Sequence, residues 1–129
     1  MKLFVVKKTL LCLSLLPVLS FASPTVPKQF QGLWVAKQTG VTCKNADTKG
    51  DVKFVSNAKG TYQHEQSCSL KKIRKQSKNS LTADWQCMEE GDEYSQSYTM
   101  MINKKHQLLR GGGTQPLQYC GLPPKEPIF

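Results

Sequence analysis

The feature that most constrains the fold is a set of four cysteines that follows an export signal. Cys43, Cys68, Cys87 and Cys120 lie in the 107 residues that remain when residues 1–22 are removed from the 129-residue chain. Exported proteins fold in an oxidising compartment, where an even number of cysteines in a short domain typically forms disulfides. We therefore expect two disulfides to stabilise one small domain, and we expect the protein to be periplasmic or secreted.

Residues 1–22 have the three parts of a secretory signal peptide: a basic start, an apolar run and small residues before the cleavage point. The apolar run, residues 9–21, is shorter than the ~20 residues that usually span a bilayer. We expect cleavage after Ala22, which leaves one domain over residues 23–129 without a transmembrane segment. Loss of the three signal-peptide lysines lowers the formal net charge from +9 to +6.

Apolar and polar residues alternate with a period of two over most of residues 30–120. Short alternating segments bounded by turn residues are typical of an all-β sandwich or barrel. We expect a small antiparallel meander that closes into a barrel, with loosely held proline-rich ends at residues 23–27 and 123–129. The expected strands are residues 30–36, 51–55, 61–75, 81–87, 94–102, 106–110 and 116–120.

The order of the cysteines suggests how they pair. A hairpin with its loop at residues 76–79 places Cys68 opposite Cys87, and opposed residues of an antiparallel pair lie within disulfide reach. The same register would bring a lysine onto the apolar face, so we expect a β-bulge between Leu70 and Ile73.

The remaining cysteines, Cys43 and Cys120, would then join the end of the first strand to the last strand and close the barrel. The alternative connectivity, in which Cys43 bonds to Cys68 and Cys87 to Cys120, stays open at this point, because four cysteines allow three pairings.

The segment Phe30-Gln31-Gly32-Leu33-Trp34 resembles the first strand of small lipocalin-like β-barrels of the bacterial periplasm. Chain length and cysteine layout are also similar to those of the periplasmic inhibitors of c-type lysozyme, which share the eight-stranded barrel plan. The resemblance implies a lipocalin-like barrel. The loop that such inhibitors insert into lysozyme would fall near residues 89–95, which lack its basic residue, so no functional residue is carried over.

Two turns carry clustered charge. Four basic residues fall at the tip of the central hairpin, and Lys78 comes shortly after them in the sequence: Lys71, Lys72, Arg74 and Lys75. It would suit an anionic partner such as a phosphorylated glycolipid or an acidic protein. We do not expect nucleic acid, because no aromatic residue for base stacking lies between Lys71 and Asn79. The alternative is a solvated tip that protects a sheet edge from aggregation.

An acidic group occupies the next turn: Glu89, Glu90, Asp92 and Glu93. It would suit a basic partner such as lysozyme. A calcium site of the EF-hand kind is not expected, because the turn lacks alternating ligands over twelve residues. The alternative is again a solvated turn.

Four aromatic residues and a run of glycines give weaker indications of a ligand-binding site. Trp34, Trp85, Tyr62 and Tyr98 are expected in the core, although they would also suit the lining of a ligand cavity. The glycines after Arg110, residues 111–113, would suit either a binding loop or a tight turn.

The chain lacks the motifs of common enzymes. It has no HExxH, GxSxG, CxxC or phosphate-binding GxxxxGK[ST] sequence. We expect His64 and Glu65 to point to opposite faces of a strand and therefore not to act together. With the cysteines oxidised, too few ligands remain for zinc.

We therefore expect no catalytic residue, no cofactor and no metal. The expected function is a non-enzymatic binding module that recognises a protein or an anionic envelope component, with an inhibitor or immunity protein as its most specific form. We expect a monomer. The alternative is a carrier of a small apolar ligand inside the barrel.

Overall fold

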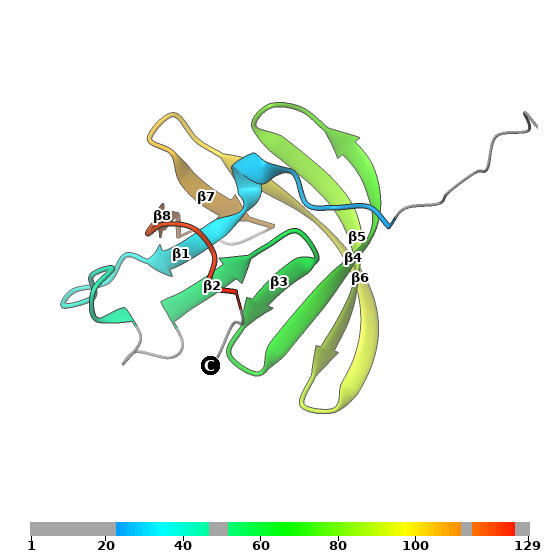
Figure 1. The fold of residues 1–129 in the computed structure, drawn as a ribbon, viewed down its shortest axis with the longest axis horizontal. Helices are drawn as coiled ribbons and strands as arrows, with labels where there is room; N and C mark the ends of the chain where they lie inside the picture. The colour runs from blue at the N-terminus through cyan, green and yellow to red at the C-terminus, as the bar shows by residue number, and fades with distance from the viewer. Residues whose placement is uncertain (1–22, 47–51, 112–114, 126–129) are drawn as a thin grey trace, which may run out of the picture.

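The computed structural model describes residues 23–46, 52–111 and 115–125. These residues form a closed antiparallel barrel of eight strands, in which each strand pairs with the next and the last pairs with the first (Figure 1). The expected all-β barrel is therefore confirmed. Its strands are β1 Gly32–Ala36, β2 Lys53–Ser56, β3 Gly60–Gln63, β4 Gln66–Gln76, β5 Ser80–Glu89, β6 Asp92–Ile102, β7 Gln107–Arg110 and β8 Leu117–Tyr119.

One apolar core fills the middle of the barrel. Trp34 of β1, Met100 of β6 and Leu108 of β7 are fully buried in it. Burial alternates along β5, as its sequence predicts, and four inward residues there are at most 1% exposed: Leu81, Ala83, Trp85 and Cys87. Side chains rather than empty space therefore occupy the centre, as is usual in small barrels.

The register of β4 with β5 follows the expected hairpin. Cys68 lies opposite Cys87, and the register shifts between Leu70 and Lys72, which confirms the expected bulge. A second shift, between Ile73 and Lys75, was not expected. Each bulge adds one residue to β4 without a partner on β5, so Ile73 packs against the core while lysines stay outside.

Both disulfides connect the cysteines in the first of the two pairings considered. Cys68 bonds to Cys87 inside the barrel, and Cys43 bonds to Cys120 across 77 residues of sequence. The second bond ties the segment after β1 to the residue after β8. It lies beside a small apolar cluster outside the barrel, in which Ala46 and Val52 cover Val35.

The expectation of one long strand over residues 61–75 is wrong. The chain turns back at His64 and Glu65, where Glu65 has a φ of 58°, and forms β3 and β4. This turn changes which residues face inward. Thr61 lies opposite the inward Cys68 and is buried, whereas Tyr62 faces outward, so Tyr62 is not a core residue.

The start of the first expected strand is also different. Residues Lys28–Phe30 form a 3-10 helix, and the indole nitrogen of Trp34 donates a hydrogen bond of 3.2 Å to the carbonyl oxygen of Phe30. Val26, in a segment expected to be loosely held, is only 1% exposed, and its backbone N–H bonds to Ala58. Its side chain belongs to the core, which fixes this part of the amino-terminal segment.

Among the described residues, no helix is long and apolar enough to cross a membrane. The expected signal peptide, residues 1–22, lies outside the described residues, as do Asp51 of the expected second strand and residues 126–129 of the carboxyl-terminal end. The two disulfides are typical of a protein that folds in an oxidising compartment.

Candidate functional site

The acidic turn lies at one end of the barrel, between β5 and β6 (Figure 1). Glu90 and Gly91 form its tip, with φ values of 48° and 88°. The turn between β3 and β4 brings Glu65 beside it. A hydrogen bond with Glu65 and repulsion from its charge raise the pKa of Glu90, and repulsion from Glu89 adds to this. We call the five exposed carboxylates the acidic end: Glu65, Glu89, Glu90, Asp92 and Glu93.

A surface hollow of about 330 Å³ adjoins the acidic end. Its walls combine Glu65 and Glu90 with the less polar side chains of Tyr62 and Met88. Met88 is 46% exposed, so its side chain is accessible to a partner. The acidic end therefore offers both charge and an apolar contact area.

The basic turn, which joins β4 to β5, lies at the opposite end of the barrel (Figure 1), but Lys71, Lys72, Arg74 and Lys75 all lie on β4 itself, with Lys72 opposite Asp84 in the middle of β5. The structure separates its members. Arg74 donates to Asp84 of β5 through Nε at 2.8 Å and Nη2 at 2.7 Å, so its charge is already paired. This contact lowers the pKa of Asp84 most, and a hydrogen bond donated by Ser97 lowers it further.

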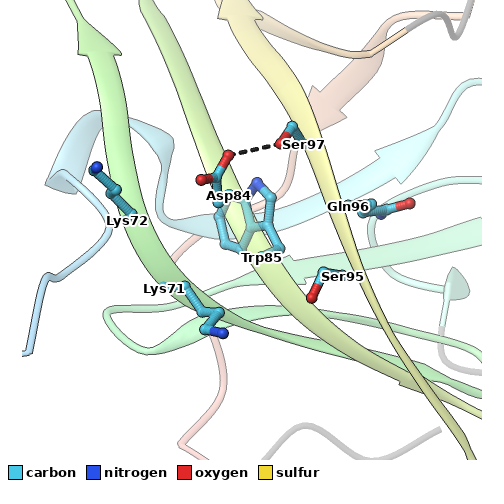
Figure 2. Close-up of a pocket in the computed structure, with 7 residues that line it drawn as sticks. All are labelled: Lys71, Lys72, Asp84, Trp85, Ser95, Gln96 and Ser97. Atoms are coloured by element: carbon cyan, nitrogen blue, oxygen red, sulfur yellow. Dashed lines mark hydrogen bonds between the residues drawn. The ribbon is translucent and has the colours of Figure 1, made fainter.

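Lys71 and Lys72 line a hollow of about 510 Å³ on the outer face of β4, β5 and β6. Figure 2 shows Asp84 between Lys72 of β4 and Ser97 of β6, with the dashed line marking the hydrogen bond between Asp84 and Ser97. Because Asp84 occupies the centre of this surface and already pairs with Arg74, the hollow has mixed charge. Lys71 and Lys72 therefore share this surface with a carboxylate.

Lysines gather elsewhere at the same end. Lys78, Lys104 and His106 line a third hollow, of about 520 Å³, where the turn after β6 meets the turn after β4. The ring of His106 stacks on Tyr119 at a centroid distance of 5.2 Å. This hollow lies open on the surface.

A fourth hollow, of about 200 Å³, opens inside the barrel and was missed by the sequence analysis. We call it the mouth pocket, and its lining comes from β2, β3, β4, β6, β7 and the residue after β7: Phe54, Gln63, Gln66, Gln96, Tyr98, Arg110 and Gly111. The guanidinium carbon of Arg110 lies 4.4 Å from the centre of the Phe54 ring.

Polar side chains in the mouth pocket form a chain of hydrogen bonds. Nη1 of Arg110 donates to Oε1 of Gln63 at 2.6 Å. The amide of Gln63 donates to Gln66, whose own amide donates to the hydroxyl of Tyr94. The one signal of this site in the sequence is that Gln96 alternates with inward tyrosines on β6.

Tyr98 bounds the mouth pocket on the side of the core. Its ring stacks on Trp85 at 5.0 Å, and its hydroxyl lies 3.1 Å from that of Thr61. Burial raises the pKa of Tyr98 to about 12. Trp34, Trp85 and Tyr98 are thus packing residues, as expected, and Tyr98 also lines the pocket.

Two further expectations concern histidine and glycine. His64 and Glu65 do not point apart, because they lie in a turn rather than a strand, and their side chains approach to 3.5 Å. Within residues 23–46, 52–111 and 115–125, no three His, Cys, Asp or Glu side chains lie together as metal ligands would. Gly111 has a φ of 48°, whereas Gly112 and Gly113 lie outside the described residues.

The fold and these surfaces define a small disulfide-linked β-barrel with five exposed carboxylates gathered at one end. No protein-family model matches the chain, and neither a curated protein nor a solved structure matches it.

Proposed function

We propose that this protein is a non-enzymatic binding module that recognises a basic protein through its acidic end. The observation that supports this most is the convergence of two turns: Glu65 joins the four carboxylates of the neighbouring turn beside a partly apolar hollow. Five of the nine acidic residues of the chain lie in this one place.

The overall charge makes a local negative patch necessary for such a partner. After loss of residues 1–22 the formal net charge is +6, which repels another basic protein at long range. Complementary charge at the contact surface overcomes this repulsion, orients the partner and raises the association rate. The raised pKa of Glu90 reports crowding of carboxylates that a cationic partner would relieve.

The hollow would supply the apolar part of the contact. Interfaces depend on a few well-packed, desolvated anchors surrounded by polar residues. Met88 and Tyr62 line the hollow together with Glu65 and Glu90, and methionine adapts its shape to different partners. An apolar side chain next to a lysine or arginine of the partner would fit this arrangement.

The most specific form of this proposal is an inhibitor or immunity protein that acts in the periplasm or outside the cell, for example against lysozyme. An anionic envelope component is the alternative partner, which would bind the basic turn. We favour the acidic end, because Asp84 already neutralises Arg74 in the basic turn.

Transport of a small apolar ligand has less support. Trp34, Trp85 and Met100 fill the middle of the barrel. The mouth pocket has walls of glutamine, tyrosine and arginine, which do not suit an apolar ligand.

The test compares two matched sets of charge-neutralising variants. The acidic set carries E65Q, E89Q, E90Q and E93Q, and the basic control set carries K71Q, K72Q, K75Q and K78Q. Each is used as bait in an extracytoplasmic extract, and hen egg-white lysozyme is titrated as a purified basic probe. We expect the wild-type protein to bind a basic protein in a salt-sensitive way, with the acidic set binding at least tenfold more weakly.

The control set should bind that basic protein as well as the wild type or better. Equal binding by the acidic set and the wild type, with the fold checked by circular dichroism, would contradict the proposal. Loss of partner binding in the control set alone would assign recognition to the basic turn instead.

A further inference from the structure

Arg110 holds a positive charge in the mouth pocket that no carboxylate balances among the described residues. Its one side-chain hydrogen bond there is to the neutral Gln63, and no acidic side chain of the described segments lies within ion-pair distance. The guanidinium is partly buried, and burial lowers its pKa. A charge removed from water is costly unless it is paired.

The surroundings hold this charge in place without neutralising it. The Phe54 ring lies 4.4 Å from the guanidinium carbon, a distance at which the ring face attracts a cation. Gln63 fixes Nη1, and Gln63 is itself fixed by Gln66. Arg110 is therefore preorganised, and most of its five N–H donors remain without an acceptor among the described residues.

We propose that the mouth pocket binds a small carboxylate, held by the guanidinium of Arg110. The planar guanidinium presents two parallel donors that match the two oxygens of a carboxylate. The volume of about 200 Å³ equals that of about seven water molecules, enough for a carboxylate with a short substituent. Gln96 and Tyr98 also line the pocket, and the amide of Gln96 would offer polar contacts to that substituent.

The acidic end does not prevent binding. Its carboxylates are exposed, and water and salt screen their charge beyond about 8 Å at physiological ionic strength. The charge of Arg110 acts inside the barrel, where the effective dielectric constant is lower and a direct contact is stronger. The mouth pocket is a neighbour of the acidic end, since Gln66 lines both hollows, but its cation, Arg110, is not part of that end.

The chain has two arginines, which provides an internal control. Arg74 already pairs with the carboxylate of Asp84, whereas Arg110 has no such partner among the described residues. In protein labelled with ¹⁵N-arginine, the two Nε–Hε signals are followed by NMR during titration with sodium propionate. Propionamide, which has the same shape without the charge, and sodium chloride at equal ionic strength are the controls.

We expect propionate to shift the Arg110 signal saturably and to leave the Arg74 signal in place, with no saturable shift from propionamide or chloride. Arg110→Lys, which keeps the charge but loses the paired donors, should weaken propionate binding at least tenfold as seen in the Tyr98 ring signals. Arg74→Lys should not weaken it.

A parallel titration with N-acetylglycine distinguishes the source of the carboxylate. Tighter binding of N-acetylglycine than of propionate would assign the site to a peptide carboxyl terminus, and the reverse would assign it to a free small acid. An Arg110 signal that does not shift with either compound, or that shifts equally with sodium phosphate or chloride, would overturn the proposal. This result does not depend on whether any variant folds.

Discussion

Cys68 and Cys87 lie directly opposite each other on β4 and β5, with their Cα atoms 4.0 Å apart and their side chains at most 2% exposed. The second disulfide is different, since Cys43 is exposed. A buried disulfide is protected from thiolate attack, because exchange requires direct access to sulfur.

We therefore expect dithiothreitol to reduce the bond between Cys43 and Cys120 first in the folded protein. Alkylation followed by peptide mapping at increasing reductant concentration measures the order. Earlier labelling of Cys68 or Cys87 would show that the buried position is not protected.

Gly60 on β3 is tightly enclosed. A Cβ atom at this position would lie 1.9 Å from the carbonyl oxygen of Cys68. Gly60→Ala should therefore lower the free energy of unfolding by about 3 kcal/mol, since the backbones of β3 and β4 must separate. Gly40→Ala is the control: it has a φ of 81° but open space, and should cost roughly 1–2 kcal/mol. Denaturant unfolding measures both, and an equal cost would contradict this account of Gly60.

Asp84 should titrate below the usual range of an aspartate. Arg74 lowers its pKa most and Ser97 next. Because the folded-state pKa is lowered, its contribution to stability is present above the unfolded-state pKa of about 3.9 and is lost as pH falls through the folded value. Arg74→Gln should raise the pKa of Asp84 more than Ser97→Ala does, as measured by NMR titration of the carboxyl carbon. The opposite order would show that Ser97 is the main partner.

Tyr98 should give the fold a dependence on alkaline pH. Burial raises its pKa to about 12, so the folded state keeps a proton that the unfolded state loses near pH 10. This contribution to stability is complete below about pH 10 and decreases as pH rises toward 12. Tyr98→Phe should flatten that decrease in unfolding experiments, whereas Tyr119→Phe should retain it. An unchanged slope in Tyr98→Phe would assign the alkaline loss to other groups.

The central hairpin could be predicted because its information is local. The period-two pattern of β5 fixes which residues face inward, and the position of Cys87 then selects Cys68 as its partner. The first bulge follows from the need to keep a lysine out of the core. The turn at His64 and Glu65 could not be found in the same way, because neither residue is among the usual turn formers.

The mouth pocket depends on closure of the barrel. Arg110 and Gln63 are 47 residues apart and meet because β7 and β3 face each other across the interior. Nothing near Arg110 in the sequence indicates that its charge points inward over Phe54. Likewise, Arg74 pairs with Asp84 beside a second bulge of β4 that the sequence pattern did not reveal.

The central claim, that partners bind at the acidic end, is tested most directly by oxidation of two methionines. Met88 lies at the acidic end and is 46% exposed, whereas Met101, near the basic turn, is 48% exposed and serves as the matched control. Hydroxyl-radical oxidation of each is measured by mass spectrometry in the free protein and in complex with the captured partner. The account predicts that the partner protects Met88 and leaves Met101 unchanged, and protection of Met101 with Met88 unchanged would contradict it.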